Sequence, residues 1–435
     1  MTAQQFVSPN EIRARFSHAM SDMYQKEVPL YGDLLELVAE TNRQVLREDA
    51  ALAHQLQITG EIERLAMERH GAIRVGTTAF RAVHEDALQI SPFRVFTSLL
   101  RLELIEDPAL RALAERLLAR RRIFTDRALE LIALQEAQGG LNEVQAQEFV
   151  EQALETFRWH NQATVSAEEY RQLHDQHRLI ADVVAFKGPH INHLTPRTLD
   201  IDRVQQAMPG RGITPKAVIE GPPRRRRAIL LRQTSFKALE ERVDFVEHDG
   251  RAVAGHHTAR FGEIEQRGVA LTTKGRELYD RLLQATNDAL QGPPSEKNAE
   301  RYYQLLEENF RAFPDDYATL REQQLAWFRY FPTECGLAAK ESLDKHSTLE
   351  QLIEKEHVRF QPLVYEDFLP VSAAGIFQSN LGDSRHAQYN AASSRAAFEQ
   401  ALGSEVIDEL ALYQQTQQRS LEACAQALGL ATLTS

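Results

Sequence analysis

Residues 239–261 read LEERVDFVEHDGRAVAGHHTARF, and this segment is the clearest indication of β-structure in the chain. Branched and aromatic residues recur in both of its halves, and such residues are typical of β-strands. The His-Asp-Gly triplet at 248–250 lies between the halves and has the composition of a tight turn. The pattern therefore predicts an antiparallel hairpin whose turn lies near Gly250.

Three more segments have the short, branched and aromatic character of strands. Glycine, proline and polar residues separate them, as is usual for strands joined by turns. They are HRLIADVVAF at 177–186, AILLRQTSF at 228–236 and HTARFGEIEQRGVALT at 257–272. Together with the hairpin, they predict a β-rich core over about 178–275.

Helical patterns precede and follow this core. The segment SPNEIRARFSHAMSDMY at 8–24 opens with Ser8 and Pro9, a capping residue and a first-turn proline, and its apolar residues recur at helical spacing. The chain is expected to leave this helix at Val28, before Pro29. Further helices are expected at 31–46, at 59–71 with Gly71 as its stop, between Pro92 and about Phe157 with Asn142 as a cap, at 296–313 and at 394–430.

Helices around a mostly antiparallel middle indicate an α+β fold. No linker-like composition interrupts the 435 residues, so we expect one domain over 1–435. It would contain an N-terminal helical region at about 8–160, the β-rich core at about 178–275, and a mixed and helical C-terminal region at about 296–430.

Charge and composition exclude several classes of protein. The formal net charge of −12 at pH 7 argues against nonspecific nucleic-acid binding and favours small-molecule partners. The two cysteines, Cys335 and Cys424, are far apart and lack metal-binding spacing, which fits a reducing cytoplasm. The N-terminus has no signal-peptide pattern and no apolar run reaches bilayer length, so neither export nor a membrane span is expected.

The first candidate site is RHGAIRVGT at 69–77, where His70 and Arg74 are four residues apart. This spacing puts both side chains on one face of a helix or of a strand, so they can point into one pocket. The alternative is a structural role for each. His70 would then cap the C-terminus of the preceding helix, and Arg74 would form a surface ion pair.

The second candidate site is AFKGPHINHLTPRTLDID at 185–202, which contains His190 and His193. Their odd spacing points them to opposite faces of an extended chain, and Pro189 and Pro196 disfavour a helix here. At most one of the two histidines is therefore an expected metal ligand. The alternative is a pair of loop histidines that hydrogen-bond to the backbone.

The third candidate site is HTARFGEIEQRG at 257–268, where Glu263 and Glu265 face the same side of one predicted strand. Carboxylates that face a core are costly unless they are paired or bind a metal. A solvated face would instead expose Phe261. Two histidines and one carboxylate from separate elements would form the facial triad of non-haem Fe(II) oxygenases.

Two other clusters are expected to have no chemical role. The run RRRR at 224–227 follows Gly-Pro-Pro, which predicts a solvated turn that leads into a strand. His256 and His257 lie in or near the predicted hairpin and are not expected to bind a metal.

These motifs sit in longer strings that resemble the bacterial 2-oxoadipate dioxygenase/decarboxylase family, also called 2-hydroxyglutarate synthases. The resemblance covers the chain from about Ser8 to Leu428. Its strings include MSDMYQKEVPLYGDLLELV at 20–38, ERHGAIRVGT at 68–77, HINHLTPRTLDID at 190–202, HTARFGEIEQRGVALT at 257–272 and YEDFLPVSAAGIFQSNLG at 365–382. It implies a vicinal-oxygen-chelate-like central sheet or half-barrel with extensive added helices.

The resemblance also implies an Fe(II) site made of two histidines and a glutamate. The match to ERHGAIR gives His70 as one ligand, and the match to HINHLT gives His193 as another, which leaves His190 a structural or supporting role. The match to RFGEIEQ favours Glu263 as the third ligand, with Glu265 as the alternative.

For the substrate, the resemblance implies contacts with His70, Arg74 and Val371. The family is assigned to lysine catabolism and converts 2-oxoadipate and O2 to 2-hydroxyglutarate and CO2. The 2-oxoacid chelates the iron, and its oxidative decarboxylation precedes hydroxylation. Two other functions suit the same donor set, namely a Zn²⁺ or Mn²⁺ hydrolase or isomerase acting on a small dicarboxylate, and a noncatalytic binding protein of the same fold.

The chain departs from the family pattern after Thr77. RVGT runs directly into TAFRAVHEDA here, whereas the relatives carry several tens of further residues that end in a histidine-containing turn. The segment is either deleted or missing from the sequence as numbered, and the intact flanking strings favour the second. A genuine deletion would affect closure of the site over substrate, because Arg74 lies just before it.

Overall fold

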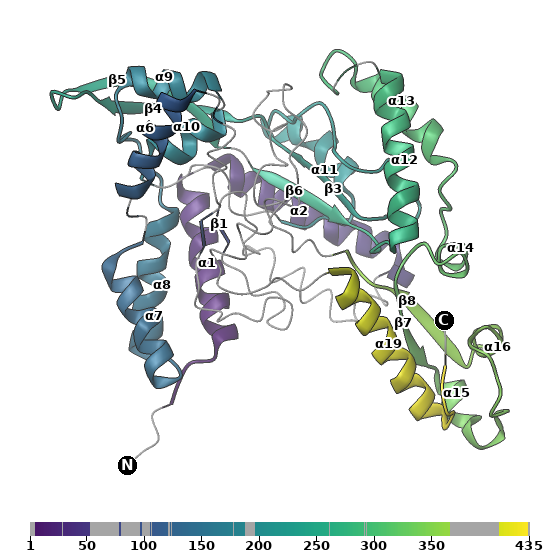
Figure 1. Cartoon of the computed structure of the whole chain (residues 1–435). Coiled ribbons are helices and arrows are strands. Elements are labelled where there is room, and N and C mark those ends of the chain that lie inside the picture. The colour runs from purple at the N-terminus through teal and green to yellow at the C-terminus, as the bar shows by residue number, and fades with distance from the viewer. Residues whose placement is uncertain are drawn as a thin grey trace. The chain divides into compact units, whose positions relative to one another are not determined.

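The computed structural model combines helices with two-stranded sheets, which confirms the expected α+β class (Figure 1). It describes residues 5–27, 29–52, 78–79, 96–97, 105, 107–120, 122, 124–176, 178–187, 196–260, 262–290, 292, 294–365 and 409–433. The expected vicinal-oxygen-chelate-like half-barrel stays a prediction. None of the helices in these ranges combines the length and apolar character needed to cross a membrane.

The chain packs as two compact units, each assembled from separate stretches of sequence. Unit 1 contains Met1–Lys216, Gln233–Glu265 and Leu369–Val406. Unit 2 contains Ala217–Arg232, Gln266–Phe368 and Ile407–Ser435. The expectation of one domain over 1–435, with its three regions, stays a prediction.

Unit 1 is mostly helical, and local sequence signals explain where its helices begin. The hydroxyl of Ser8 accepts a hydrogen bond from the Glu11 N–H (3.2 Å) at the first helix, and Asn142 forms a capping box with Gln145. Both predicted caps are thus confirmed. The described helices are α1 Pro9–Glu27, α2 Pro29–Glu48, α6 Pro108–Arg120, α7 Asp126–Gln138, α8 Glu143–Leu154, α9 Ala167–Gln176, α10 Arg178–Ala185 and α11 Ile201–Ala207, with 3-10 turns η2 Glu155–Phe157 and η3 Met208–Arg211.

The hairpin predicted from the His-Asp-Gly turn is present. Strands β4 (Leu239–Val246) and β5 (Ala252–Arg260) pair antiparallel. Gly250 takes the left-handed conformation at φ +83° and donates to the Glu247 carbonyl (2.8 Å), which closes the turn. Helices α6, α9 and α10 lie beside the hairpin in Figure 1 and share a hydrophobic cluster with it. Unit 1 also contains a second antiparallel pair of strands, β1 (Thr78–Ala79) and β2 (Phe96–Thr97), each two residues long.

The prediction of a strand at 177–186 is wrong, because residues Arg178–Ala185 form helix α10. A largely apolar run does not distinguish a buried helix from a buried strand by its period. Here every residue from Ile180 to Ala185, including Asp182, is buried. Because the helix is buried on all sides over this stretch, its sequence does not alternate between apolar and polar residues at helical spacing.

Unit 2 is built around a second hydrophobic cluster. Strands β7 (Phe328–Pro332) and β8 (Val358–Pro362) pair antiparallel, and α19 (Glu409–Leu428) lies along them (Figure 1). Leu421 and Cys424 of α19 pack into this cluster beside Phe328. The remaining helices are α12 Thr273–Leu290, α13 Ala299–Phe310, α14 Tyr317–Glu322, α15 Glu334–Ala338 and α16 Leu349–Glu354, with η4 Lys340–Ser342. The helices predicted at 296–313 and in the described part of 394–430 are thus confirmed.

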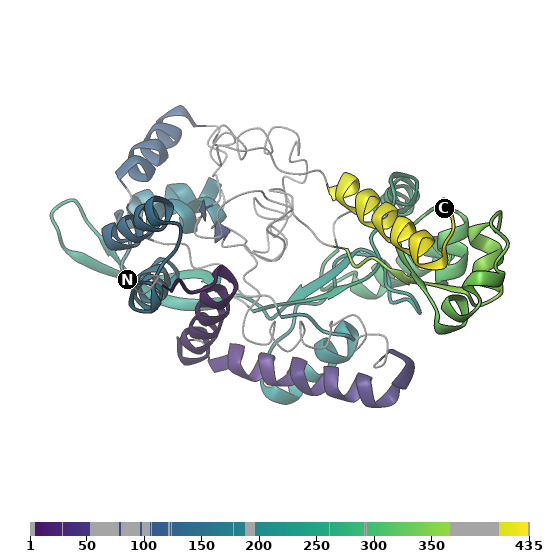
Figure 2. The ribbon, with the colours of Figure 1, turned by 90° about the horizontal axis from the view of Figure 1, so that it is seen from below.

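Two strands, β3 (Leu231–Ser235) and β6 (Glu263–Arg267), confirm the strands predicted in AILLRQTSF and HTARFGEIEQRGVALT. Helix α2 packs against the short α11 in unit 1, and Figure 2 shows the two helices next to each other. Between Pro196 and α11, the chain pairs with β6 through Arg197 and Glu265. It thus links β6 to the pair of helices α2 and α11.

Candidate metal and substrate site

The strands β3 and β6 run antiparallel, and their ends fix the register. The Phe236 N–H donates to the Gly262 carbonyl (3.1 Å) beyond one end of the pair. The Gly268 N–H donates to the Leu230 carbonyl (2.8 Å) beyond the other end. Both hydrogen bonds give the same register across all five residues of each strand.

This register places four polar side chains on one face. Ser235 lies opposite Glu263, and Gln233 lies opposite Glu265. Residues directly opposite each other in an antiparallel pair project to the same side, and so do residues two apart along one strand. The sequence-based prediction that Glu263 and Glu265 share a face is therefore confirmed.

The other edge of β6 pairs with the segment that contains Arg197. The Glu265 N–H donates to the Pro196 carbonyl (3.1 Å), and the Thr198 N–H donates to the Glu265 carbonyl (2.8 Å). The guanidinium Nε of Arg197 lies 3.2 Å from Glu265 Oε1, and both side chains are almost fully buried. Pro196 is three residues after His193, so the chain leaves the candidate ligand segment along the strand that carries Glu263.

We call these five residues the polar face: Arg197, Gln233, Ser235, Glu263 and Glu265. Each is at least nine-tenths buried, with exposed fractions between 0% for Ser235 and 8% for Arg197. Among the residues that the structure describes, the side-chain nitrogen of Gln233 and the hydroxyl of Ser235 have no hydrogen-bond partner. A buried polar atom of this kind costs about 1–3 kcal/mol, so each one calls for an explanation.

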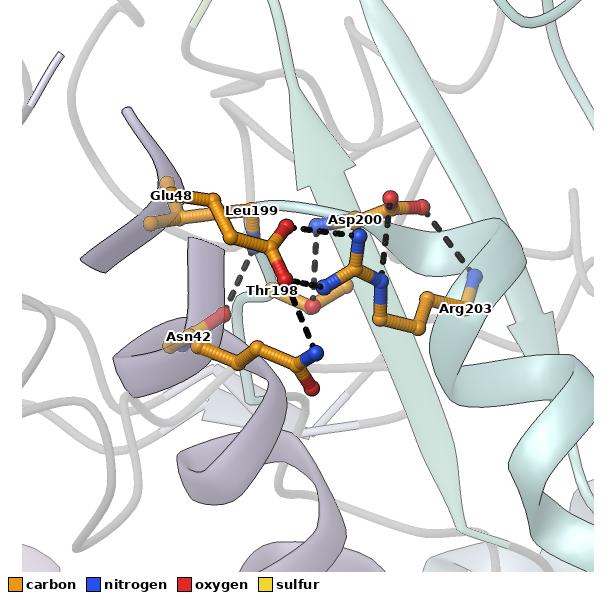
Figure 3. Close-up of polar contacts among 7 residues, drawn as sticks. Asn42, Glu48, Thr198, Leu199, Asp200 and Arg203 are labelled. Atoms are coloured by element: carbon orange, nitrogen blue, oxygen red, sulfur yellow. Dashed lines mark hydrogen bonds and ion pairs between the residues drawn. The ribbon is translucent and has the colours of Figure 1, made fainter. Parts of the chain in front are cut away.

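The segment that follows the candidate ligands is held by α2 (Figure 3). The amide of Asn42 donates to the Arg197 carbonyl (3.0 Å), and its oxygen accepts from the Leu199 N–H (2.7 Å). One side chain thus satisfies the backbone on both sides of Thr198, as a neighbouring strand would. Asp200 then caps α11 by accepting from the Arg203 N–H (3.0 Å).

A surface ion pair also joins α2 to α11. Arg203 donates through both terminal nitrogens to Glu48, at 3.2 and 2.9 Å, and Gln44 donates to the same carboxylate at 2.8 Å. The hydrogen bond from Arg203 holds the pKa of the Glu48 carboxyl below its usual value. The pair tethers the end of α2 to α11 (Figure 3).

Glu263 and Glu265 are the only members of the predicted ligand and substrate set within the described part of the chain. His70, Arg74, His190, His193 and Val371 lie outside the described residues. In the described ranges, no group of three or more histidine, cysteine, aspartate or glutamate side chains is arranged to hold a metal ion. Of the predicted ligands and substrate contacts, the structure therefore gives the surroundings of Glu263 and Glu265 alone.

The described contacts distinguish Glu265 from Glu263. Glu265 forms the buried ion pair with Arg197, which compensates its charge. Glu263 is 3% exposed on the same face of β6. A carboxylate oxygen can bind a divalent metal ion, so either glutamate has the chemistry of the predicted oxygen ligand. The assignment of Glu263 as that ligand stays a prediction.

Sequence reasoning missed a buried chain of polar side chains in unit 1. His257 lies 2.8 Å from Asp182 through Nε2 and 2.7 Å from the Tyr170 hydroxyl through Nδ1, and it is only 1% exposed. The His-His pair at 256–257 was visible in the sequence. The partners of His257 were not, because Asp182 and Tyr170 lie 75 and 87 residues away in the chain. The expectation that His257 binds no metal stays a prediction.

The prediction of a solvated RRRR turn is wrong for Arg225. Its side chain is 4% exposed and lies over the Phe313 ring at 5.2 Å, and it donates to the Phe313 and Pro314 carbonyls at 3.1 and 2.6 Å. Burial lowers the pKa of its guanidinium. The ring, the two carbonyls and the Asp315 carboxylate, 3.5 Å from the guanidinium, compensate the buried charge. These partners lie about 90 residues further along the chain, so the sequence did not reveal them.

Comparison with known proteins gives a consistent result. A family model described as 2-oxoadipate dioxygenase/decarboxylase matches residues 16–79 and 76–380. The boundary between the two matches coincides with Thr77, where the sequence departs from the family pattern.

Individual relatives span nearly the whole chain. A 2-oxoadipate dioxygenase/decarboxylase of Pseudomonas putida is 62% identical over 466 aligned positions, covering 100% of both chains, and that of Escherichia coli is 52% identical, covering 96% of this chain and 98% of the relative. A crystal structure of the Pseudomonas putida hydroxyglutarate synthase in complex with 2-oxoadipate matches with a TM-score of 0.84 at 60% identity. That match covers 98% of this chain and 100% of the other.

Proposed function

The chain belongs to the 2-oxoadipate dioxygenase/decarboxylase family, and we propose that it converts 2-oxoadipate and O2 to 2-hydroxyglutarate and CO2. The reaction would serve lysine breakdown in the cytoplasm. From the structure, the supporting observation is that Glu263 is 3% exposed, on the face of β6 that also carries the buried pair of Arg197 and Glu265. The family likeness supplies the substrate class.

We propose that His70, His193 and Glu263 hold Fe(II). Two imidazoles and one carboxylate leave three positions of an octahedral ion open, which is the donor set of non-haem iron oxygenases. When bound, the iron supplies a two-point anchor for a 2-oxoacid and the means to activate O2. The substrate is itself a 2-oxoacid, so no separate oxoacid cosubstrate is needed.

The chain's own residues would orient the substrate and protect the reaction. Arg74 would hold a carboxylate of 2-oxoadipate in a bidentate, charge-assisted pair, and Val371 would lie against the carbon chain. The burial of the polar face keeps bulk water from the neighbourhood of Glu263. A substrate without the distal carboxylate would leave a buried guanidinium unpaired and should bind poorly.

The reaction balances without another reactant. One carbon of 2-oxoadipate leaves as CO2, the former keto carbon becomes a carboxylate, and the adjacent carbon gains a hydroxyl. Both oxygen atoms of O2 enter the products, and the two electron pairs that O2 accepts come from the C–C bond that breaks and the C–H bond that is hydroxylated.

An oxygen-electrode assay tests the proposal against the other functions that suit the same ligands. With Fe(II) bound, the protein should consume one O2 and release one CO2 for each 2-oxoadipate. Zn²⁺ in place of iron should support no O2 uptake. Turnover of a dicarboxylate with Zn²⁺ or Mn²⁺ and no O2 uptake would indicate a hydrolase or isomerase instead. Binding of 2-oxoadipate without turnover under any metal would indicate a noncatalytic protein.

A further inference from the structure

Strand β3 brings two buried hydrogen-bond donors to the face that carries Glu263. Ser235 is 0% exposed and lies opposite Glu263, and Gln233 is 6% exposed and lies opposite Glu265. The Ser235 hydroxyl and the Gln233 side-chain nitrogen have no hydrogen-bond partner among the described residues. The two groups are therefore available to a ligand that binds beside Glu263.

We propose that Gln233 and Ser235 contact the substrate, donating hydrogen bonds to the carboxylate or keto oxygens of a 2-oxoacid bound beside Glu263. This inference rests on the proposed function and extends it. Neither residue belongs to the metal and substrate set that the family resemblance implies.

The chemistry of the two groups suits an anionic ligand. A serine hydroxyl and a glutamine amide nitrogen both donate, and hydrogen bonds to a charged acceptor are stronger than those between neutral groups. A carboxylate presents two oxygens and about four lone-pair sites, so it can accept from both donors while it also contacts a metal.

The polar face also carries two buried carboxylates, and Arg197 pairs with that of Glu265. Opposite charges attract, so a divalent cation bound at Glu263 would favour an anionic ligand beside the two donors. Gln233 and Ser235 would then complete an anion site next to the cation.

The opposite face of the same strand provides a matched control. Thr234 lies between the two donors, is 2% exposed and projects to the other side of β3. Thr234→Val and Ser235→Ala each remove one buried hydroxyl from adjacent positions. Only Ser235→Ala removes it from the polar face.

The experiment measures 2-oxoadipate binding to the Fe(II)-loaded protein by calorimetry without O2, and steady-state kinetics with O2. Ser235→Ala and Gln233→Met should each weaken 2-oxoadipate binding by about tenfold or more and raise KM more than they lower kcat. Thr234→Val should keep the wild-type affinity. Fe(II) affinity should stay within about threefold of wild type in all three variants, since none removes a ligand.

Thermal unfolding of the ligand-free protein separates a substrate contact from a structural one. If the Ser235 hydroxyl contacts substrate, its removal should leave the ligand-free Tm unchanged or higher while affinity falls, because an unsatisfied buried group has been deleted. A lower ligand-free Tm with unchanged 2-oxoadipate affinity in both Ser235→Ala and Gln233→Met overturns the inference. If one variant does not fold, the other decides by the same criteria.

The outcomes for the wild-type protein keep this inference distinct from the proposed function. If wild-type protein binds 2-oxoadipate without consuming O2, the proposed reaction is wrong, and the variants' affinities still decide the role of Gln233 and Ser235. If it turns over 2-oxoadipate and the variants match it, the reaction stands and the inference is overturned. If it does not bind 2-oxoadipate at all, both are overturned.

Discussion

Arg197 and Glu265 form a buried ion pair, with Arg197 Nε 3.2 Å from Glu265 Oε1, beside a second buried carboxylate at Glu263. Because Glu265 is committed to the guanidinium, we expect Glu263 to be the carboxylate ligand of the metal. Glu263→Ala should therefore abolish stoichiometric Fe(II) binding, measured by equilibrium dialysis under argon.

Glu265→Gln is the matched comparison. It should keep stoichiometric Fe(II) binding, although loss of one partner from a buried ion pair should lower the free energy of unfolding by about 3–5 kcal/mol. Wild-type iron affinity in Glu263→Ala, together with its loss in Glu265→Gln, would reverse the assignment.

The two histidines of the HINH segment should behave differently. His193→Ala should lose Fe(II), because the segment that leads from it at Pro196 joins the strand of Glu263. His190→Ala should keep Fe(II), since residues three apart in an extended chain face opposite sides. Metal content measured by plasma emission spectroscopy after gel filtration compares the two. Equal iron loss in both variants is incompatible with a single ligand from this segment.

Arg74→Lys should lose activity while iron remains bound. Lysine keeps the positive charge but lacks the planar fork that pairs with both oxygens of a carboxylate. We expect kcat/KM for 2-oxoadipate to fall on the order of a hundredfold, as a misplaced substrate requires. Iron content and steady-state kinetics are measured on the same preparation. Loss of iron would instead assign Arg74 to support of the metal site.

Asn42 should position the segment that follows His193. Asn42→Ala removes two hydrogen bonds to the backbone of Arg197 and Leu199, which should cost about 1–3 kcal/mol of stability. If this segment fixes the direction of His193, Fe(II) affinity should fall about tenfold, as for other groups that support metal ligands. Gln44→Ala on the same helix removes an exposed contact to Glu48 and should leave Fe(II) affinity unchanged. Equal Fe(II) affinities in both variants and wild type would show that Asn42 does not support the metal site.

The two cysteines should differ in reactivity. Cys335 is exposed, whereas Cys424 is 1% exposed, and burial raises the pKa of its thiol from about 9 to about 11. Iodoacetamide at pH 8 should modify Cys335 in the folded protein and Cys424 only after unfolding, as peptide mass spectrometry can show.

The raised pKa of Cys424 also makes the stability of the folded protein depend on pH. The unfolded thiol ionises above about pH 9, while the folded thiol stays neutral to about pH 11. The contribution of the neutral thiol to stability is thus fully present below about pH 9 and is lost as the pH rises through about 11. Urea unfolding of wild type and Cys424→Ala across this range measures it. Identical pH dependence in the two proteins would contradict the assignment.

Local signals predicted the parts of the fold that depend on neighbouring residues. Ser8 and Asn142 marked helix starts, and Gly250 marked the hairpin turn, because caps and tight turns are formed within a few residues. The parity of Glu263 and Glu265 likewise predicted their common face. The strand expected at 177–186 was wrong because burial on all sides erases the period that separates helix from strand.

Contacts between distant residues were not predictable in this way. Arg197 and Glu265 are 68 residues apart, and Asn42 holds a segment about 155 residues away. No pattern in one sequence pairs these residues. The choice of Glu263 over Glu265 first came from the family resemblance, and its physical reason, the ion pair with Arg197, needed the structure.

Incubation with ¹⁸O2 measures whether both oxygen atoms of O2 enter the products. With Fe(II) and 2-oxoadipate, mass spectrometry should find 2-hydroxyglutarate that carries two labelled oxygen atoms, one in the new carboxylate and one in the hydroxyl. A 2-hydroxyglutarate product with one labelled atom or none, or 2-oxoadipate left intact by the iron-loaded protein, would show that the proposed reaction is wrong.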